Sequence, residues 1–413
     1  MIFSVEARDL DLELDLPLSK SESNRALMIA FYAGKELYDV PISDSDDTRL
    51  LQRIIDKINN ADKRDVVEID CANAGTVFRF LMTALSMEEG CWVLTGSERM
   101  RQRPIGALVD TLRSLGVEIE YLAEESYPPV MLRGCRVNGG ETVVCAEQSS
   151  QFVSSLLLAA PLWENGLNLH IKGVISSLPY IDMTINMMKK CGIDVLRNDR
   201  DIIVKPGIYN LDGIVIEPDW SAAAFWYEMT ALSNSTRIVL NNLNINSLQA
   251  DSVSSRLFEL MGVKSMAVKN GVMIERNNSI TGQLKFDFTN SPDLFPAVIA
   301  TCAGLQVDAI FSGLRNLSVK ESDRKKAMMN ELSKINVSFK NVSEDTLEML
   351  APDVLPRFTE NNPLIFNNYA DHRIAMALSI LSMKIGAVSM NNIEVVSKSY
   401  PNFYEIIDRS CRL

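Results

Sequence analysis

Amphipathic segments recur along this chain, each followed by a glycine or asparagine and then by a β-branched strand start. The clearest copies lie at residues 104–119, 180–195, 251–263 and 323–337, and weaker ones lie at 47–59 and 401–412. Their apolar residues recur at helical spacing, so each copy predicts an amphipathic helix that leads into a strand. The clearest copies start about 70 to 75 residues apart, which is long enough for a compact β/α subdomain. The pattern therefore predicts a series of similar subdomains, six in all.

A second set of segments is apolar on all sides and lies between the amphipathic ones. These segments are residues 26–32, 78–87, 152–162, 222–232, 294–305 and 374–385. Helices this apolar are buried on most sides, so we expect them at the middle of each domain with mixed sheets outside. Short β-branched runs predict strands at residues 142–144, 202–204, 214–216 and 237–240. The phase of the repeat places a domain boundary near residues 217–219, after three units.

Length and composition predict a soluble protein of two domains. The 413 residues exceed one ordinary core, and 47% hydrophobic with 23% charged residues is typical of a globular chain. The acidic start does not look like a signal peptide, and no apolar run is long enough to cross a bilayer, so we predict a cytoplasmic protein. A net charge of −12 argues against nucleic acid or an anionic membrane as the partner.

Cysteine and histidine are placed in a way that argues against metal and disulfide frameworks. The seven cysteines are scattered and never form a CxxC pair, and His170 and His372 are the two histidines of the chain. Structural zinc, a disulfide scaffold and a histidine-built metal site are therefore not expected.

A candidate anion site lies at residues 17–25. Ser19 and Glu22 have the spacing of a capping box, which predicts a helix that begins near Lys20 with free backbone N–H groups, hydroxyls and a cation at one point. Arg25 is near enough to reach the other end of a larger ligand. The alternative is a capped surface helix with solvated charges.

Similar polar clusters precede the other apolar helices. They are Asn73-Ala74-Gly75-Thr76 with Arg79 one turn on, Ser149-Ser150-Gln151, Asp293, and Asp371-His372-Arg373. Cations also lie at or just before the start of amphipathic segments, within residues 99–103, within residues 320–326 and at Lys398. Each cluster alone is compatible with a solvated face, an i, i+3 surface pair between Glu321 and Arg324, or a helix cap at His372. Their recurrence predicts that several helix N-termini converge on one polar ligand, because a core helix needs a single cap.

The ordered motifs of the chain resemble the 5-enolpyruvylshikimate-3-phosphate synthase family. They run SKSESNRAL, NAGTVFR, RQRPIGALVD, SSQF, SSLPYIDMT, SPD, VKESDR and DHRIAMA, and end with a lysine before the last helix, from Leu16 to Lys398. UDP-N-acetylglucosamine enolpyruvyl transferases are less similar, because their KN pair and loop cysteine have no counterpart here. Leu18, Ala72 and Leu178 depart from residues that are common in the family.

The resemblance implies transfer of an enolpyruvyl group from phosphoenolpyruvate to shikimate 3-phosphate, without metal or organic cofactor. It implies phosphoenolpyruvate ligands at Lys20, Asn73, Gly75, Arg103, Gln151, Arg324, His372, Arg373 and Lys398. It implies shikimate 3-phosphate ligands at Lys20, Ser21, Arg25, Ser149, Ser150, Gln151, Ser177, Tyr180, Asp293, Asn316 and Lys320. Guanidinium and ammonium groups suit these anions and would offset their mutual repulsion.

The resemblance also implies the catalytic residues. Asp293 is expected to accept the proton of the 5-hydroxyl, while Glu321 and Lys20 exchange protons at the enolpyruvyl carbon and the leaving phosphate. The division of work between Glu321 and Lys20 stays open, because the sequence gives no distances.

The implied fold is α/β, an inside-out barrel of two domains with three βαβαββ units each, hinged so that they close on ligand. Residues 1–16 with 218–413 would form one discontinuous domain, for phosphoenolpyruvate and catalysis, and 17–217 the other, for shikimate 3-phosphate. We expect a monomer. Two alternatives remain at this point: an enolpyruvyl or phosphoryl transferase for another phosphorylated or nucleotide-linked alcohol, and a non-catalytic anion-binding protein.

Overall fold

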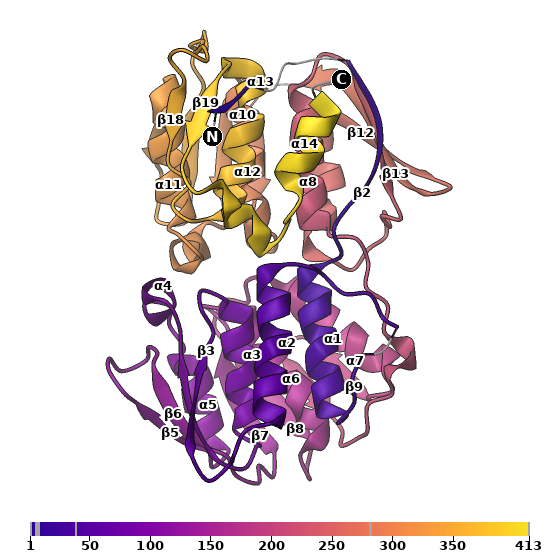
Figure 1. Cartoon of the computed structure of the whole chain (residues 1–413), viewed down its shortest axis with the longest axis vertical. Coiled ribbons are helices and arrows are strands. Elements are labelled where there is room, and N and C mark those ends of the chain that lie inside the picture. The colour runs from indigo at the N-terminus through magenta and orange to yellow at the C-terminus, as the bar shows by residue number, and fades with distance from the viewer. Residues whose placement is uncertain (1, 5–8, 38, 281–282, 412–413) are drawn as a thin grey trace. The chain divides into compact units, whose positions relative to one another are not determined.

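The computed structural model describes residues 2–4, 9–37, 39–280 and 283–411. The chain divides into two compact units, and Figure 1 draws their helices and strands. The first unit comprises Met1–Ser19, Asp44–Asp46 and Glu217–Leu413, and the second comprises Lys20–Ser43 and Asp47–Ile216. The sequence did not indicate that the short segment Asp44–Asp46 belongs with the first unit.

In its described residues, the second unit contains three buried helices, three amphipathic helices and two sheets. The buried helices are α1 (Lys20–Tyr32), α3 (Gly75–Leu85) and α6 (Ser150–Ala159), and the amphipathic ones are α2 (Asp46–Asn59), α5 (Gly106–Ser114) and α7 (Leu178–Lys190), with a short α4 (Glu98–Arg101). One sheet has the order β3 (Val66–Asp70), β4 (Cys91–Thr95), β6 (Val130–Arg133), β5 (Glu118–Tyr121), and the other β7 (Gly140–Cys145), β8 (Leu167–Lys172), β10 (Asp201–Val204), β9 (Val195–Asn198).

The three buried helices of the second unit pack against one another and present their N-termini at one end. Arg79 bonds to Gln151, and Thr83 lies 2.5 Å from Ser155, so α3 and α6 run parallel and in register. Arg25, in the second turn of α1, donates to the hydroxyl of Ser154 in α6. Free backbone N–H groups and the positive ends of three helix dipoles therefore gather in one place.

The first unit repeats this arrangement. Its buried helices are α8 (Trp220–Leu232), α10 (Phe295–Leu305) and α12 (His372–Ile380), the last followed by α13 (Ser382–Ile385), and its outer helices are α9 (Ser254–Glu259), α11 (Arg324–Leu332) and α14 (Phe403–Cys411). One sheet has the strand order β12 (Met261–Val268), β13 (Gly271–Ile280), β11 (Thr236–Asn241), β2 (Leu10–Asp15). Another has the order β14 (Leu284–Asp287), β15 (Ala309–Ser312), β17 (Leu347–Leu350), β16 (Ser338–Asn341). A smaller sheet has the order β1 (Ile2–Phe3), β19 (Val388–Met390), β18 (Leu364–Phe366).

Close packing at the far end shows that α8, α10 and α12 also run parallel. A β-carbon on Gly304, near the end of α10, would lie 2.7 Å from Leu232 and 3.0 Å from Leu381, which end α8 and follow α12. At the opposite end, Arg373 in the first turn of α12 reaches Asp293 just before α10. Glycine at position 304 thus allows the three C-terminal ends to converge, and the three N-termini converge on the polar cluster described below.

All five sheets formed by the described residues are mixed and combine a parallel pair with an antiparallel one. The parallel pairs are β3 with β4, β7 with β8, β2 with β11, β14 with β15, and β18 with β19. The predicted α/β class, with apolar helices inside and mixed sheets around them, is confirmed.

Two details differ from the sequence predictions. Antiparallel hairpins follow α5, α7, α9 and α11. After α2, however, only residues 60–65 lead to β3, and this segment is too short for a hairpin. Among the described residues, the first subdomain of the second unit therefore has two helices and no sheet of its own. The strand predicted at 214–216 is wrong. Ile214 and Ile216 are buried and Val215 is exposed, as in a strand, but only Pro218 pairs, through an isolated bridge to Leu18.

Candidate functional site

Arg324 is the centre of a charged cluster in the first unit. It is the first residue of α11, and its side chain is 1% exposed. Its Nη1 lies 2.6 Å from Oδ1 of Asp293, its Nη2 3.0 Å from Oε2 of Glu321 and its Nε 2.8 Å from Oδ2 of Asp371. Burial by itself would lower the pKa of Arg324, but the carboxylates of Asp371, Glu321 and Asp293 raise that pKa above its ordinary value. The guanidinium therefore holds three carboxylates from three different segments.

Asp293 is surrounded by cations in turn. Arg373 lies 3.1 Å from its Oδ2, and Lys320 lies 3.4 Å from its Oδ1. Burial by itself would raise the pKa of Asp293, but Arg373, Lys320 and Arg324 hold that pKa well below its usual range. The Asp293 side chain is 19% exposed, so a ligand can reach it. Asp293 is thus an ionised carboxylate that remains accessible.

Asp371 anchors this cluster to the helix core. It is fully buried, its side chain caps α12 by accepting from the backbone N of Arg373, and it also accepts from the hydroxyl of Ser322. His372 follows with a side chain that is 1% exposed and with Nδ1 3.8 Å from Oδ1 of Asp371. Arg324 and Arg373 are therefore both positioned by one carboxylate.

The remaining predicted residues of the first unit lie around this cluster. The Nζ of Lys398, at the end of a 3₁₀ turn (Ile393–Lys398), lies 4.0 Å from Oε1 of Glu321. Asn316 is half-buried in another 3₁₀ turn (Arg315–Val319), next to Lys320. The structure thus brings Asp293, Lys320, Glu321, Arg324, Arg373 and Lys398 into one connected set.

Two arginines crowd around Gly75 at the start of α3 in the second unit. A β-carbon on Gly75 would lie 2.6 Å from Nη1 of Arg79 and equally close to Nη1 of Arg103. Gln151, in the first turn of α6, accepts a hydrogen bond from Arg79 and donates one to Thr76. A hydrogen side chain at position 75 therefore lets two like charges face one spot, an arrangement that favours an anion there.

Lys20 begins α1, and its Nζ lies 3.1 Å from Oδ2 of Asp47 at the start of α2. Ser21 follows in the first turn, and its backbone carbonyl accepts from Nη1 of Arg25. The carbonyl of Asn73, just before α3, lies 3.5 Å from Nη1 of Arg103. Lys20 and Arg103 thus both come from segments that open a helix.

Arg25 lies deeper than the sequence suggested. It is 2% exposed, and it donates to the hydroxyls of Thr184 and Ser154 and to the carbonyls of Ser21 and Tyr180. Burial lowers the pKa of Arg25 to about 10, which remains high enough for a cation at neutral pH. Most of its donors hold helices together, so a substrate contact by Arg25 stays a prediction.

The predicted serines lie at the N-termini of α6 and α7. Ser149 caps α6 and accepts from the backbone N of Gln151, and Ser150 is buried beside it. Ser177 precedes α7 with a left-handed backbone, φ 57°, a conformation that is uncommon for a non-glycine residue and is often found at functional sites. The Tyr180 ring lies 6.0 Å from the guanidinium of Arg25.

Several polar residues of these clusters escaped the sequence prediction. Arg79 was visible in its motif, one turn beyond Gly75, but was not chosen as a ligand. Asp371 was likewise visible in the cluster Asp371-His372-Arg373 but was not chosen as a site residue, and Asp47 lies beside Lys20. Asp251 carries no sequence signal, yet its Oδ2 accepts from Ser221 and lies 3.9 Å from Nη1 of Arg373.

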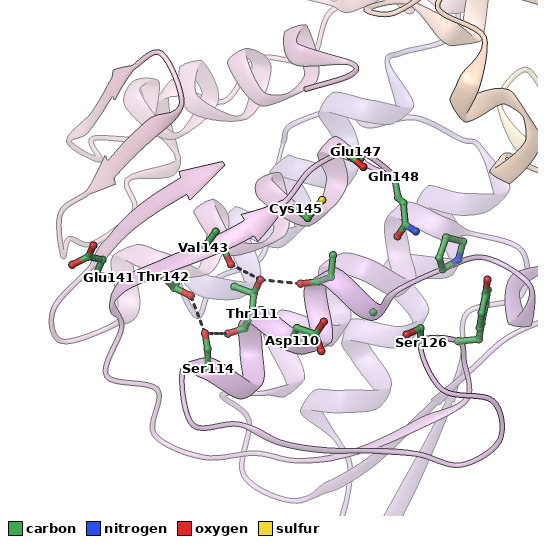
Figure 2. Close-up of a pocket in the computed structure, with 14 residues that line it drawn as sticks. Asp110, Thr111, Ser114, Ser126, Glu141, Thr142, Val143, Cys145, Glu147 and Gln148 are labelled. Carbon is green, nitrogen blue, oxygen red and sulfur yellow. Dashed lines mark hydrogen bonds between the residues drawn. The ribbon is translucent and has the colours of Figure 1, made fainter. Parts of the chain in front are cut away.

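A separate cavity of about 590 Å³ lies between α5 and β7 of the second unit (Figure 2). Thr111 donates to the carbonyl of Val143, and Ser114 lies 2.8 Å from Thr142, so hydroxyls join the helix to the strand. Its lining includes Asp110, Glu141 and Glu147 but no lysine or arginine, so it does not suit an anionic substrate. In the described part of the chain, no group of three or more His, Cys, Asp or Glu side chains is placed to hold a metal ion.

Comparison with known proteins gives the family. The sequence model of the EPSP synthase (3-phosphoshikimate 1-carboxyvinyltransferase) family matches residues 6–407. A 3-phosphoshikimate 1-carboxyvinyltransferase of Bacteroides fragilis is 36% identical over 95% of this chain and 93% of its own length, and that of Vibrio vulnificus is 33% identical over 95% of both. The chain therefore belongs to the EPSP synthase family.

Solved structures show the same fold. An EPSP synthase from Acinetobacter baumannii aligns with a TM-score of 0.74 at 22% identity, covering 99% of this chain and 98% of its own. The enolpyruvyl transferase NikO from Streptomyces tendae aligns with a TM-score of 0.70 at 13% identity over 99% and 97%. Among the described residues, no helix is both long and apolar enough to span a membrane.

Proposed function

We propose that this protein transfers the enolpyruvyl group of phosphoenolpyruvate to the 5-hydroxyl of shikimate 3-phosphate and releases phosphate. Family membership supports the reaction. The observation that links the reaction to particular residues is that Asp293 is an accessible carboxylate, kept ionised by Arg373, Lys320 and Arg324. A base for the 5-hydroxyl must be ionised at neutral pH, and Asp293 is.

The reaction is an addition followed by an elimination. The 5-oxygen bonds to C2 of phosphoenolpyruvate while its proton passes to Asp293 and a proton is added to the methylene carbon, which gives a tetrahedral ketal. A proton is then lost from the new methyl group as phosphate leaves. Glu321, bonded to Arg324 and near Lys398, and Lys20, paired with Asp47, are the proposed partners in the two carbon-centred proton steps.

The ion pairs also regulate the basicity of Asp293. Three neighbouring cations favour the ionised form and make it a weak base. When an anionic substrate draws Arg373 or Lys320 towards itself, the pKa of Asp293 rises and proton transfer to it becomes easier. Substrate binding would thus activate the base, and no metal or organic cofactor is needed, because side-chain cations stabilise the developing charge.

In this proposal the second unit supplies mainly anion ligands. Arg103, Gly75, Gln151, Asn73 and Lys20 hold phosphoenolpyruvate together with Arg324, His372, Arg373 and Lys398. Shikimate 3-phosphate is held by Ser21, Arg25, Ser149, Ser150, Ser177 and Tyr180, by Lys20 and Gln151, which contact both substrates, and by Asp293, Asn316 and Lys320. Closure of the two domains, a monomeric state and a cytoplasmic location stay predictions.

The test is phosphate release from phosphoenolpyruvate in chelated buffer, with and without shikimate 3-phosphate. We expect release that requires both substrates, resists chelation and falls at least about a hundredfold in Asp293→Asn. Asp11→Asn, in an exposed pair with Arg237, is the control and should match the wild type. No release with folded wild type contradicts the proposal and directs the search to other phosphorylated or nucleotide-linked alcohols.

A further inference from the structure

Arg79 is buried at the centre of the second-unit cluster. It lies one turn into α3, is 3% exposed, and its guanidinium carbon lies 5.4 Å from the centre of the Phe152 ring. Its Nη1 donates to Oε1 of Gln151 over 2.7 Å. The hydroxyl of Ser155 donates to the Arg79 backbone carbonyl, so the turn that carries this arginine is tied to α6.

This hydrogen bond determines how the Gln151 amide is turned. An arginine has donors and no acceptor, so the amide oxygen must face Arg79 and the amide NH₂ must face the other way. The Nε2 of Gln151 indeed donates to Oγ1 of Thr76 over 2.8 Å. One hydrogen of the NH₂ group is used in this bond, and the second remains for a ligand.

The orientation of the Gln151 amide also determines how the Thr76 hydroxyl is used. Because the Thr76 hydroxyl accepts from Gln151, its own hydrogen can point towards a further acceptor. Thr76 follows Gly75, where Nη1 of Arg79 and Nη1 of Arg103 crowd one point. The hydrogen-bonded chain from Arg79 through Gln151 to Thr76 thus starts at an arginine whose Nη1 shares the space beside Gly75 with Nη1 of Arg103, and each hydrogen bond in such a chain strengthens the next.

We propose that Arg79 is a positioning residue that turns the Gln151 amide and the Thr76 hydroxyl so that both donate to the anionic group of phosphoenolpyruvate held by Arg103. This inference rests on the proposed function. Arg79 acts through Gln151, so its loss should reduce the affinity for phosphoenolpyruvate much as the loss of Gln151 does, and should change shikimate 3-phosphate binding no more than the loss of Gln151 does.

The main test is a double-mutant cycle of Arg79→Lys and Gln151→Ala, read as KM for phosphoenolpyruvate. Each single change should raise KM roughly tenfold, and the double change should raise it by about the same factor, because residues that act as a unit are not additive. A roughly hundredfold rise in the double variant would show two independent contributions and overturn the inference. So would an unchanged KM in Arg79→Lys.

Arg113→Lys is the matched control. Arg113 also lies over an aromatic ring, 5.0 Å from Tyr121, and donates to a backbone carbonyl, that of Ile119, outside the cluster. It should leave KM unchanged. A purely structural role of Arg79 would instead lower the unfolding temperature and weaken shikimate 3-phosphate binding more than Gln151→Ala does, results that would also overturn the inference.

A second pair of variants tests the far end of the hydrogen-bonded chain if Arg79→Lys does not fold. Thr76→Val keeps the shape and removes the hydroxyl, and should raise KM for phosphoenolpyruvate several-fold, while Thr76→Ser should restore it. Equal KM values for Thr76→Val and wild type would contradict the inference.

Binding of inorganic phosphate in the presence of shikimate 3-phosphate, measured by calorimetry, repeats the cycle without turnover. If wild type and Arg113→Lys release no phosphate from the two substrates, the proposed function fails. If they do and the cycle is additive, only the positioning role fails.

Discussion

The two charged clusters are built on the same arrangement of helices but serve different purposes. In the first unit Arg324 is surrounded by Asp293, Glu321 and Asp371, so nearly every cation already has a carboxylate. In the second unit Arg79 and Arg103 crowd around Gly75, and the Gln151 side chain that accepts from Arg79 and donates to Thr76 is a neutral amide. Three convergent helix N-termini thus form a charge-balanced site suited to proton transfer in one unit and a set of donors suited to anion binding in the other.

The comparison teaches that the helical scaffold attracts anions and that the added carboxylates decide the chemistry. Carboxylates among the cations bring proton acceptors to the site but reduce its affinity for anions, because they compete for the same donors. If this division is correct, removing a carboxylate from the first cluster should affect turnover most, and disturbing the second cluster should affect affinity most.

Glu321→Gln should have the largest effect. Its amide keeps the shape beside Arg324 but can no longer exchange a proton, so kcat should fall about 10² to 10⁴-fold while the affinity for shikimate 3-phosphate stays within a few-fold of wild type. Steady-state kinetics with calorimetric binding measures both. Loss of affinity with unchanged kcat would reverse the assigned roles of the clusters.

Arg324→Met should have the largest effect on stability. Removing the guanidinium leaves buried Asp371 and its neighbours without their shared partner, which should cost about 3–5 kcal/mol of unfolding free energy. Urea unfolding measures this cost. The control Arg237→Met removes an arginine from the exposed pair with Asp11 and should cost less than about 1 kcal/mol. Equal costs in both variants would mean that the buried network does not stabilise the unit.

Asp251 should give a pH-dependent stability of moderate size. Burial raises the pKa of Asp251 to about 6 despite the nearby Arg373. The folded state then binds more protons than the unfolded state between about pH 4 and pH 6, so this group makes stability fall as pH rises through that range, by roughly 1–3 kcal/mol. Unfolding at several pH values should show this slope in wild type and not in Asp251→Asn. An identical slope in both would contradict the assignment.

Asp293 should act with the opposite sign. The pKa of Asp293 is held well below its usual range, so its contribution to stability is present above about pH 4 and is lost as pH falls further. Comparison of wild type with Asp293→Asn below pH 4 should therefore show the difference between them shrink. A difference that grows on acidification would exclude an ionised Asp293 in the folded state.

Gly75→Ala should have the smallest of these effects. The new β-carbon meets the ends of two flexible side chains, so both arginines shift and the fold survives. We expect KM for phosphoenolpyruvate to rise about three- to tenfold, since the charge-assisted contact of Arg103 and the Arg79 side chain that orients Gln151 are displaced rather than removed. Gly207→Ala, on the surface with only Ile193 nearby at 3.1 Å, is the control and should not change KM. An unchanged KM in Gly75→Ala would show that the guanidinium positions around it do not matter.

The periodicity of the sequence predicted most of the helices, because each buried helix is apolar all round and each outer helix is amphipathic. The helix start near Lys20 is confirmed. The strand at 214–216 failed because alternation reports which side chains are buried, not whether a neighbouring strand offers backbone partners. The missing hairpin after α2 was not recognised, because spacing alone does not reveal what lies between two helices.

The sequence by itself determined the family, the helical framework and the segments that carry polar groups to helix N-termini. These depend on local order along the chain: periodicity, caps and motifs. Only the tertiary structure decided that Arg324 holds three carboxylates, that buried Arg25 joins helices through hydrogen bonds, and that Asp251 faces Arg373. Such contacts join residues far apart in the chain, and pKa values follow from burial and charge in three dimensions, which no single stretch of sequence encodes.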